Sequence, residues 1–140
     1  MPEPKTAKNR LHLDLRPTTS MQAEVDRLVA LGATVRGFIE VEGGFWTQMR
    51  DPEGNEFCVI EPGNSFLADC GFIGALSSDG SQAVGYFWSE ALGWPLVWDQ
   101  DEEAAIRSPR GGPKITWGGP PLTPKTGKER LHLDLAPPLD

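Results

Sequence analysis

The chain has 140 residues, enough for one domain whose core needs neither disulfides nor a metal ion to hold it together. Its 13 basic and 20 acidic residues give a formal net charge of -7 without a basic stripe, so we expect no nucleic-acid partner. There are two cysteines, no N-terminal apolar signal region and no run of roughly 18 apolar residues, so we expect no membrane span and a reducing, cytoplasmic location.

One segment of the sequence occurs twice. Residues 4–17, PKTAKNRLHLDLRP, return as residues 124–137, PKTGKERLHLDLAP, with 11 of 14 positions identical and an offset of 120 residues. That offset exceeds the roughly 20 to 50 residues of solenoid repeats and matches the size of a small domain. The chain therefore holds one repeat period plus an overlap, and its two similar strands compete for one position in the fold.

The first part of the chain predicts a strand, a helix and three further strands. Residues 10–16 alternate between apolar and polar side chains, as a half-buried strand does. Thr19 and Ser20 are N-cap candidates for a helix whose apolar stripe ends at Gly32. Turn residues then separate three strands, at about 35–41, 45–50 and 56–61. The order is βαβββ.

The second part repeats this order. A strand at 72–76 precedes Asp79, a candidate N-cap, and a helical stripe that ends at Gly93. Three strands follow near 96–99, 104–107 and 114–117, and the repeated strand is expected at 130–135. With the joint at Pro62-Gly63-Asn64, the chain divides into residues 1–62, 63–123 and 124–140.

Two motifs carry a family resemblance. Residues 51–58, DPEGNEFC, and residues 92–94, LGW, preceded by Phe87-Trp88, resemble signatures of the glyoxalase-like group in the vicinal oxygen chelate superfamily. The resemblance implies an α+β fold in which two βαβββ modules form an open, curved eight-stranded sheet. Helices would cover its outer face, and a ligand or metal would sit on the concave face. Residues 1–62 resemble the family's second module and 63–123 its first, so the modules stand in permuted order, followed by a copy of the second module's opening strand.

The resemblance also bears on metal binding. Metal-dependent relatives hold a divalent ion with about four His or Glu side chains from four strands. His12 stands at one ligand position, His132 is its copy, and Cys58 stands where a glutamate is usual. Residues 71–76 and 114–117 contain no histidine or carboxylate. Because one ligand of four remains, we expect neither a metal nor another cofactor.

Two interpretations stay open for His12 and two for Cys58. His12 is either a strand residue that hydrogen-bonds to a neighbour or a metal ligand, and the sequence offers no evident third donor beside Cys58. Cys58 is either a small buried apolar residue or a reactive thiol, which would need a nearby cation.

The five tryptophans suggest a pocket. Those on strands either line a cavity, with a few polar groups beside them, or fill the interface between sheet and helices. Asp14 either faces this pocket or pairs with Arg10 or Arg16. The ligand-binding candidates are His12, Asp14, Trp46, Gln48, Glu56, Cys58, Trp98, Trp117 and His132.

These observations predict a small-molecule-binding protein without a metal centre. The alternative is a lyase, isomerase or dioxygenase-type enzyme that uses a metal or the pair His12 and Glu56, and a third hypothesis is a structural or dimerisation module. A strand copy left outside the sheet would expose unpaired backbone groups. We therefore expect a homodimer, with an exchanged strand or module as its candidate mechanism.

Overall fold

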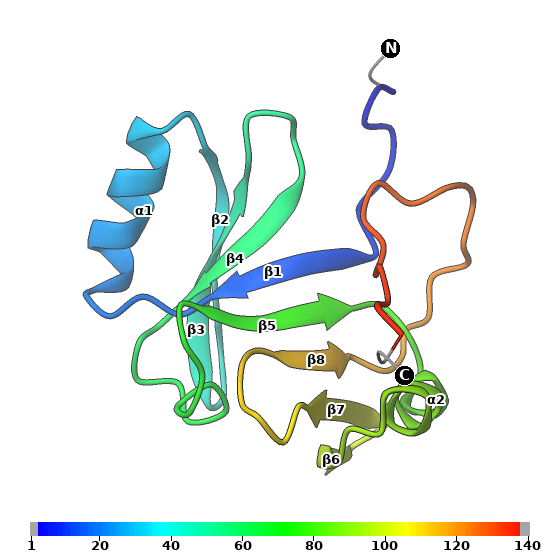
Figure 1. The fold of residues 1–140 in the computed structure, drawn as a ribbon. Helices are drawn as coiled ribbons and strands as arrows, with labels where there is room; N and C mark the ends of the chain where they lie inside the picture. The colour runs from blue at the N-terminus through cyan, green and yellow to red at the C-terminus, as the bar shows by residue number, and fades with distance from the viewer. Residues whose placement is uncertain (1–2, 138–140) are drawn as a thin grey trace.

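The computed structural model describes residues 3–137 and contains one open, eight-stranded sheet with two helices (Figure 1). The first half comprises β1 (Leu11–Leu15), α1 (Met21–Ala30), β2 (Thr34–Val41), β3 (Gly44–Arg50) and β4 (Glu56–Ile60). The second half comprises β5 (Ile73–Ser78), α2 (Gln82–Leu92), β6 (Leu96–Gln100), β7 (Glu103–Arg107) and β8 (Lys114–Trp117). Neither helix is long and apolar enough to cross a membrane, as judged on the described residues.

The sheet confirms the predicted α+β architecture of paired βαβββ units. Its strand order is β2-β3-β4-β1-β5-β8-β7-β6. In each half the first strand runs parallel to the last, because β1 pairs with β4 and β5 pairs with β8. The halves meet through the antiparallel pair β1 and β5. β1 is therefore a central strand that joins the two halves.

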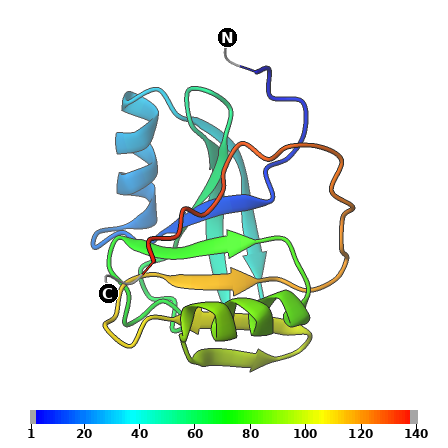
Figure 2. The same cartoon turned by 45° about the vertical axis from the view of Figure 1, so that its right-hand side comes forward.

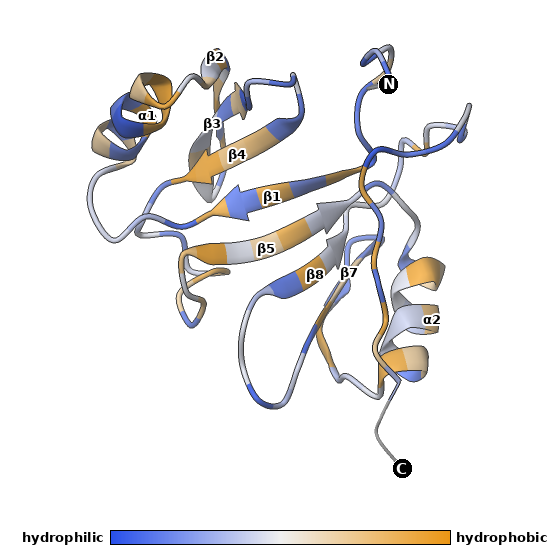
Figure 3. Ribbon diagram, turned by 45° about the horizontal axis from the view of Figure 1, so that its top comes forward, coloured by the Kyte–Doolittle hydropathy of each residue, from blue (hydrophilic) through white to orange (hydrophobic). Residues whose placement is uncertain are grey.

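Helix α1 covers the first half-sheet. The Ser20 hydroxyl accepts a hydrogen bond from the Ala23 N–H at 3.1 Å, which makes Ser20 rather than Thr19 the N-cap. The chain leaves the helix through Gly32, whose φ of 103° suits glycine. Val25 packs between Met49 and Val59, and the alternating colours of α1 in Figure 3 show its apolar side.

Helix α2 covers the second half-sheet, and its start corrects one prediction. Ser81, not Asp79, is the N-cap residue. Asp79 instead accepts hydrogen bonds from Lys8 at 2.9 and 3.0 Å, and its N–H donates to the Arg10 carbonyl. The helix ends, as predicted, at Gly93 in the left-handed conformation.

The C-terminal copy of the repeated segment corrects another prediction. The N-terminal copy forms β1, whereas residues 130–135 belong to no strand. The described part of this segment, residues 124–137, has no regular secondary structure; residues 1–2 and 138–140 of the expected segments 1–62 and 124–140 lie outside the described residues. In Figure 2 the segment crosses the view in front of β1 and β5.

Candidate functional site

The sheet face turned away from the helices, here called the open face, holds two adjoining cavities. The first measures about 460 Å³ and the second about 610 Å³. Both are lined by Asp14, Phe66, Ser77 and Glu103, so they meet over the seam between β1 and β5. This arrangement places two ligand-sized hollows next to each other.

Three side chains with donor atoms converge in the first cavity. His12 and Asp14 lie on the same face of β1, with His12 Nε2 at 3.3 Å from Asp14 Oδ1. Asp14 is the register partner of Cys58 on the parallel strand β4. One donor atom from each residue lies within 4.8 Å of the other two. The sequence reasoning missed Asp14 as the third donor, although its i, i+2 spacing from His12 in a strand was a signal for it.

Burial and the neighbouring carboxylate keep the Cys58 thiol protonated. Desolvation, followed by the charge of Asp14 and a hydrogen bond to it, raises the pKa of Cys58 to about 12. A reactive thiolate needs the opposite environment, with a lowered pKa. With its thiol protonated, Cys58 fits the interpretation as a small, buried apolar residue.

Glu56 is already engaged by basic and backbone groups. It lies 2.8 Å from Lys5 Nζ and 4.0 Å from Arg36 Nη1, and it accepts a hydrogen bond from the Asn9 N–H at 3.2 Å. Although burial acts to raise it, the bonds from Lys5 and Asn9 hold the pKa of Glu56 below its usual range. A carboxylate stabilised in its ionised form is a poor general base at neutral pH. This arrangement weakens the enzyme hypothesis that pairs Glu56 with His12.

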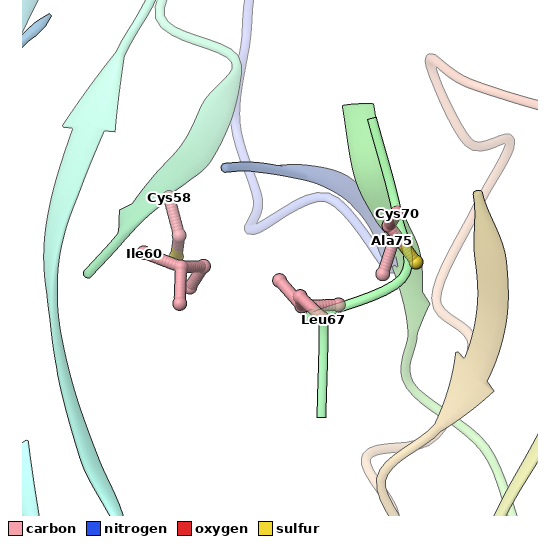
Figure 4. Close-up of a cluster of buried hydrophobic side chains, with 5 residues drawn as sticks. All are labelled: Cys58, Ile60, Leu67, Cys70 and Ala75. Atoms are coloured by element: carbon pink, nitrogen blue, oxygen red, sulfur yellow. The ribbon is translucent and has the colours of Figure 1, made fainter. Parts of the chain in front are cut away.

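An apolar cluster contributes Cys58, Ile60 and Leu67 to the lining of the first cavity. Figure 4 shows Cys58 and Ile60 from β4, Ala75 from β5, and Leu67 and Cys70 from the connection between those strands. Trp46 and Phe66 pack against this cluster. Both cysteines are free and buried. The connection 61–72 therefore supplies apolar side chains that bridge the two halves beside the first cavity.

The second cavity combines aromatic rings with a buried ammonium group. The Phe66 and Trp98 rings meet edge to face, with centroids 5.9 Å apart. Lys114 is only 9 % exposed; its Nζ lies 4.1 Å from the Phe66 ring centroid and donates to the Phe66 carbonyl. At the rim, partial burial and the nearby Asp101 raise the pKa of Glu103.

The structure gathers most of the predicted site residues. The first cavity is lined by His12, Asp14, Trp46, Gln48, Glu56 and Cys58. Trp98 lines the second cavity. The sequence analysis did not include three other lining residues among its candidates: Phe66, Lys114 and Glu103. The alternating pattern of β8, Lys-Ile-Thr-Trp, was a signal for Lys114, whereas Phe66 lies in a connection without a periodic pattern.

Two further candidates, Trp117 and His132, are placed differently from the others. Trp117 borders the second cavity but is 3 % exposed and packs in the core beneath α2, with Ile106 and Ile115. His132 lies on the C-terminal segment, where its Nε2 is 3.0 Å from Asp134 Oδ1 and its side chain is 71 % exposed. Neither of the two open-face cavities is lined by His132.

The residues present do not fit a divalent ion held by four strands. His12, Asp14 and Cys58 come from β1 and β4 alone, and the open-face residues of β5 and β8 include Ser77, Thr116 and the cation Lys114. The nitrogen, oxygen and sulfur donors of the β1–β4 cluster instead suit zinc with an open position. This three-donor set is the arrangement that a metal-assisted alternative would use.

The paired units define a class of protein: two-module α+β domains with one open, mixed sheet whose helices lie on one side. Comparison with family profiles matches the glyoxalase-like domain at residues 1–60 and 75–140. The chain therefore belongs to the glyoxalase-like domain family, within the vicinal oxygen chelate superfamily, which confirms the resemblance inferred from its motifs. Comparison with curated proteins gave no significant match.

Proposed function

We propose that this protein binds a small organic molecule in the adjoining cavities of the open face, without a metal ion. The observation that supports this function is the combination in these cavities of aromatic walls and a few polar groups at the seam. The donors come from two strands instead of four, and the raised pKa of Cys58 disfavours a thiolate nucleophile, so both observations support binding over catalysis.

Cations line each cavity, Lys8 and Arg36 the first and Lys114 the second, but the charged groups that line both cavities are carboxylates. Asp14 and Glu103 line both cavities, and no Lys or Arg of the described chain forms an ion pair with either carboxylate. Trp46, Phe66 and Trp98 supply apolar surface on either side. We therefore propose a ligand with an aromatic or other flat apolar part and a cationic or hydrogen-bond-donating group that meets the carboxylates.

A matched compound panel tests this function. Thermal unfolding is measured with aromatic amines and with the corresponding aromatic acids, because a ligand that binds only the folded state raises the melting temperature. We expect shifts with amines, smaller shifts in Asp14→Asn and Trp98→Ala, and unchanged shifts in Phe38→Ala. Phe38 is exposed on β2 and lines none of the cavities described above, so it is the control. Shifts with acids alone, or equal shifts in every variant, would reject this ligand site.

A metal-assisted lyase, isomerase or dioxygenase is the second candidate, because His12, Asp14 and Cys58 form a compact donor set. Bound zinc would polarise a substrate oxygen or activate a water molecule. The three side chains would hold the ion, and Lys114 would be positioned to bind an anionic group. Metal content separates the two candidates.

We also propose a reducing, cytoplasmic location. The two cysteines, Cys58 and Cys70, are free thiols in buried surroundings, which suits a compartment where thiols stay reduced. Fractionation of the native host cells tests this location.

A further inference from the structure

The repeated segment gives the chain two candidates for its central strand. The copies share the sequence RLHLDL, at residues 10–15 and 130–135. The first copy lies between β4 and β5 with Leu15 8 % exposed, whereas Leu135, its counterpart, is 57 % exposed. The second copy is thus a strand-forming sequence that lies outside the sheet.

We propose that residues 130–135 are an alternative occupant of the β1 position in the same chain. In the exchanged state they pair with β4 and β5, and residues 10–15 leave the sheet. All six side chains are identical, so every pairing of β1 with its neighbours is available to the second copy.

The second copy already begins at the entrance to this position. Glu129 Oε2 accepts a hydrogen bond from the Arg10 N–H at 3.3 Å, and Arg10 Nη1 donates to the Thr123 carbonyl at 2.6 Å. Arg130, the counterpart of Arg10, follows directly. Residues 118–129 therefore already lead to the place where the exchanged strand would begin, with Glu129 taking the position of Asn9 and Arg130 that of Arg10.

The connection from β8 is also long enough. β8 is separated from the β1 position by one strand, β5, which corresponds to roughly 10 Å across the sheet. The connecting residues 118–129 span up to about 40 Å when extended. Because the second copy is tethered, its effective concentration at its own sheet exceeds that of a separate chain at ordinary protein concentrations.

Two flanking differences explain why the N-terminal copy occupies the position. Asn9 is buried; its backbone N–H donates to the Glu56 carboxylate, and its side-chain NH2 donates to Asn55 Oδ1 at 3.1 Å. Glu129 in the same position would place a second carboxylate beside Glu56. Arg16 Nη1 donates to the Cys70 carbonyl at 3.0 Å, a bond that Ala136 lacks. Both differences favour the first copy.

The exchange preserves the donor residues of the open face. His132 would stand where His12 stands, and Asp134 where Asp14 stands, so the His–Asp pair would be supplied by the other end of the chain. The two copies already share this pair, with contacts of 3.3 and 3.0 Å between histidine and carboxylate.

Limited trypsin digestion of the folded full chain tests the exchange. In the unchanged protein we expect rapid cleavage after Arg130 and resistance after Arg10. The variant Glu129→Asn/Ala136→Arg keeps the N-terminal copy intact and gives the second copy the favoured flanks, so cleavage after Arg10 should appear and cleavage after Arg130 should slow. Adding Asn9→Glu and Arg16→Ala should reverse the original pattern. Full resistance after Arg10 in the first variant would overturn the proposal, and so would an effect that depends on protein concentration, which would assign the exchange to pairs of chains.

A second measurement uses the buried leucine. We expect Leu135→Ala to leave the melting temperature unchanged in the natural chain but to lower it in the Leu15→Ala background, where the second copy has replaced the damaged strand. Such coupling between residues that lie in different copies arises only if both compete for one position. Additive effects of Leu15→Ala and Leu135→Ala would overturn the proposal.

Discussion

Asp14 on β1 is the direct register partner of Cys58 on β4, and both residues line the first cavity, where Cys58 belongs to an apolar cluster. Burial, with the charge of Asp14, raises the pKa of Cys58 to about 12. Burial, together with the same carboxylate that contacts His12, therefore favours the neutral form of the thiol.

Removing the charge of Asp14 should make Cys58 more reactive. In Asp14→Asn the desolvation of the thiol remains but the repulsion is lost, so its pKa should fall. A fall of one unit would increase the thiolate fraction about tenfold at pH values below the pKa. Alkylation with iodoacetamide at pH 9, measured by mass spectrometry in a Cys70→Ser background, checks this. Equal alkylation rates in the protein with Asp14 and in Asp14→Asn would show that burial alone raises the pKa of Cys58.

We expect purified protein to contain no stoichiometric transition metal, because the donors come from two strands instead of four. Elemental analysis of protein never exposed to chelator or nickel resin checks this. His12→Ala should weaken ligand binding by about 0.5–1.5 kcal/mol, the range of one hydrogen bond, and leave the fold intact. One equivalent of zinc that disappears in His12→Ala would favour the metal-assisted enzyme instead.

Glu56 should stabilise the fold only above acidic pH. The pKa of Glu56 is lowered in the folded protein. Its contribution to the free energy of unfolding is therefore fully present at pH values above the pKa of the unfolded state, about 4.3, and is lost as the pH falls through the pKa of the folded state. At pH 7 we expect Glu56→Gln to cost about 1–3 kcal/mol, since Lys5 and the Asn9 N–H lose a charged partner. Urea unfolding at pH 7 and pH 3 checks this. The exposed Glu40→Gln is the control, and a cost that persists unchanged at pH 3 would contradict the assignment.

Gly85 on α2 allows the helix to approach the sheet closely. A Cβ at this position would lie 2.6 Å from the Ala104 Cβ and 3.1 Å from Trp117 Cε3. Alanine favours helices by up to about 1 kcal/mol over glycine, but we expect overpacking to dominate and Gly85→Ala to destabilise by about 1–3 kcal/mol. The control is Gly37→Ala on β2, which meets no atom within 4 Å. A melting temperature that rises in Gly85→Ala would show that the helix can move outward without cost.

The exposed edge strand β6 is consistent with a homodimer. All five of its residues are exposed, including Leu96, Val97 and Trp98, and its outer edge has no neighbouring strand in the sheet. We predict a dimer at tens of micromolar, a range in which modest association is observed. Light scattering checks the mass, and Val97→Lys should favour the monomer. A monomeric mass for the unchanged protein at these concentrations would contradict the prediction.

Alternation and turn residues were sufficient to predict all eight strands of the sheet and both helices, because the strands of each half are short and separated by glycine, proline or aspartate. The same rules failed for residues 130–135, which have the pattern of a strand. The local pattern shows which secondary structure a segment can form. Which of the two copies becomes β1 depends on their flanking residues, such as Asn9 and Glu129. Likewise, the sequence predicted His12 and Cys58 but not Phe66, since the position of an irregular connection depends on tertiary packing.

The single seam between β1 and β5 has an evolutionary consequence. Each half contains its own helix and its own parallel strand pair, and the halves meet side by side instead of end to end. Which half is translated first is then irrelevant to the finished sheet. Genes for such domains can be rearranged without changing the seam, provided that the contacts of the connection 61–72 are kept.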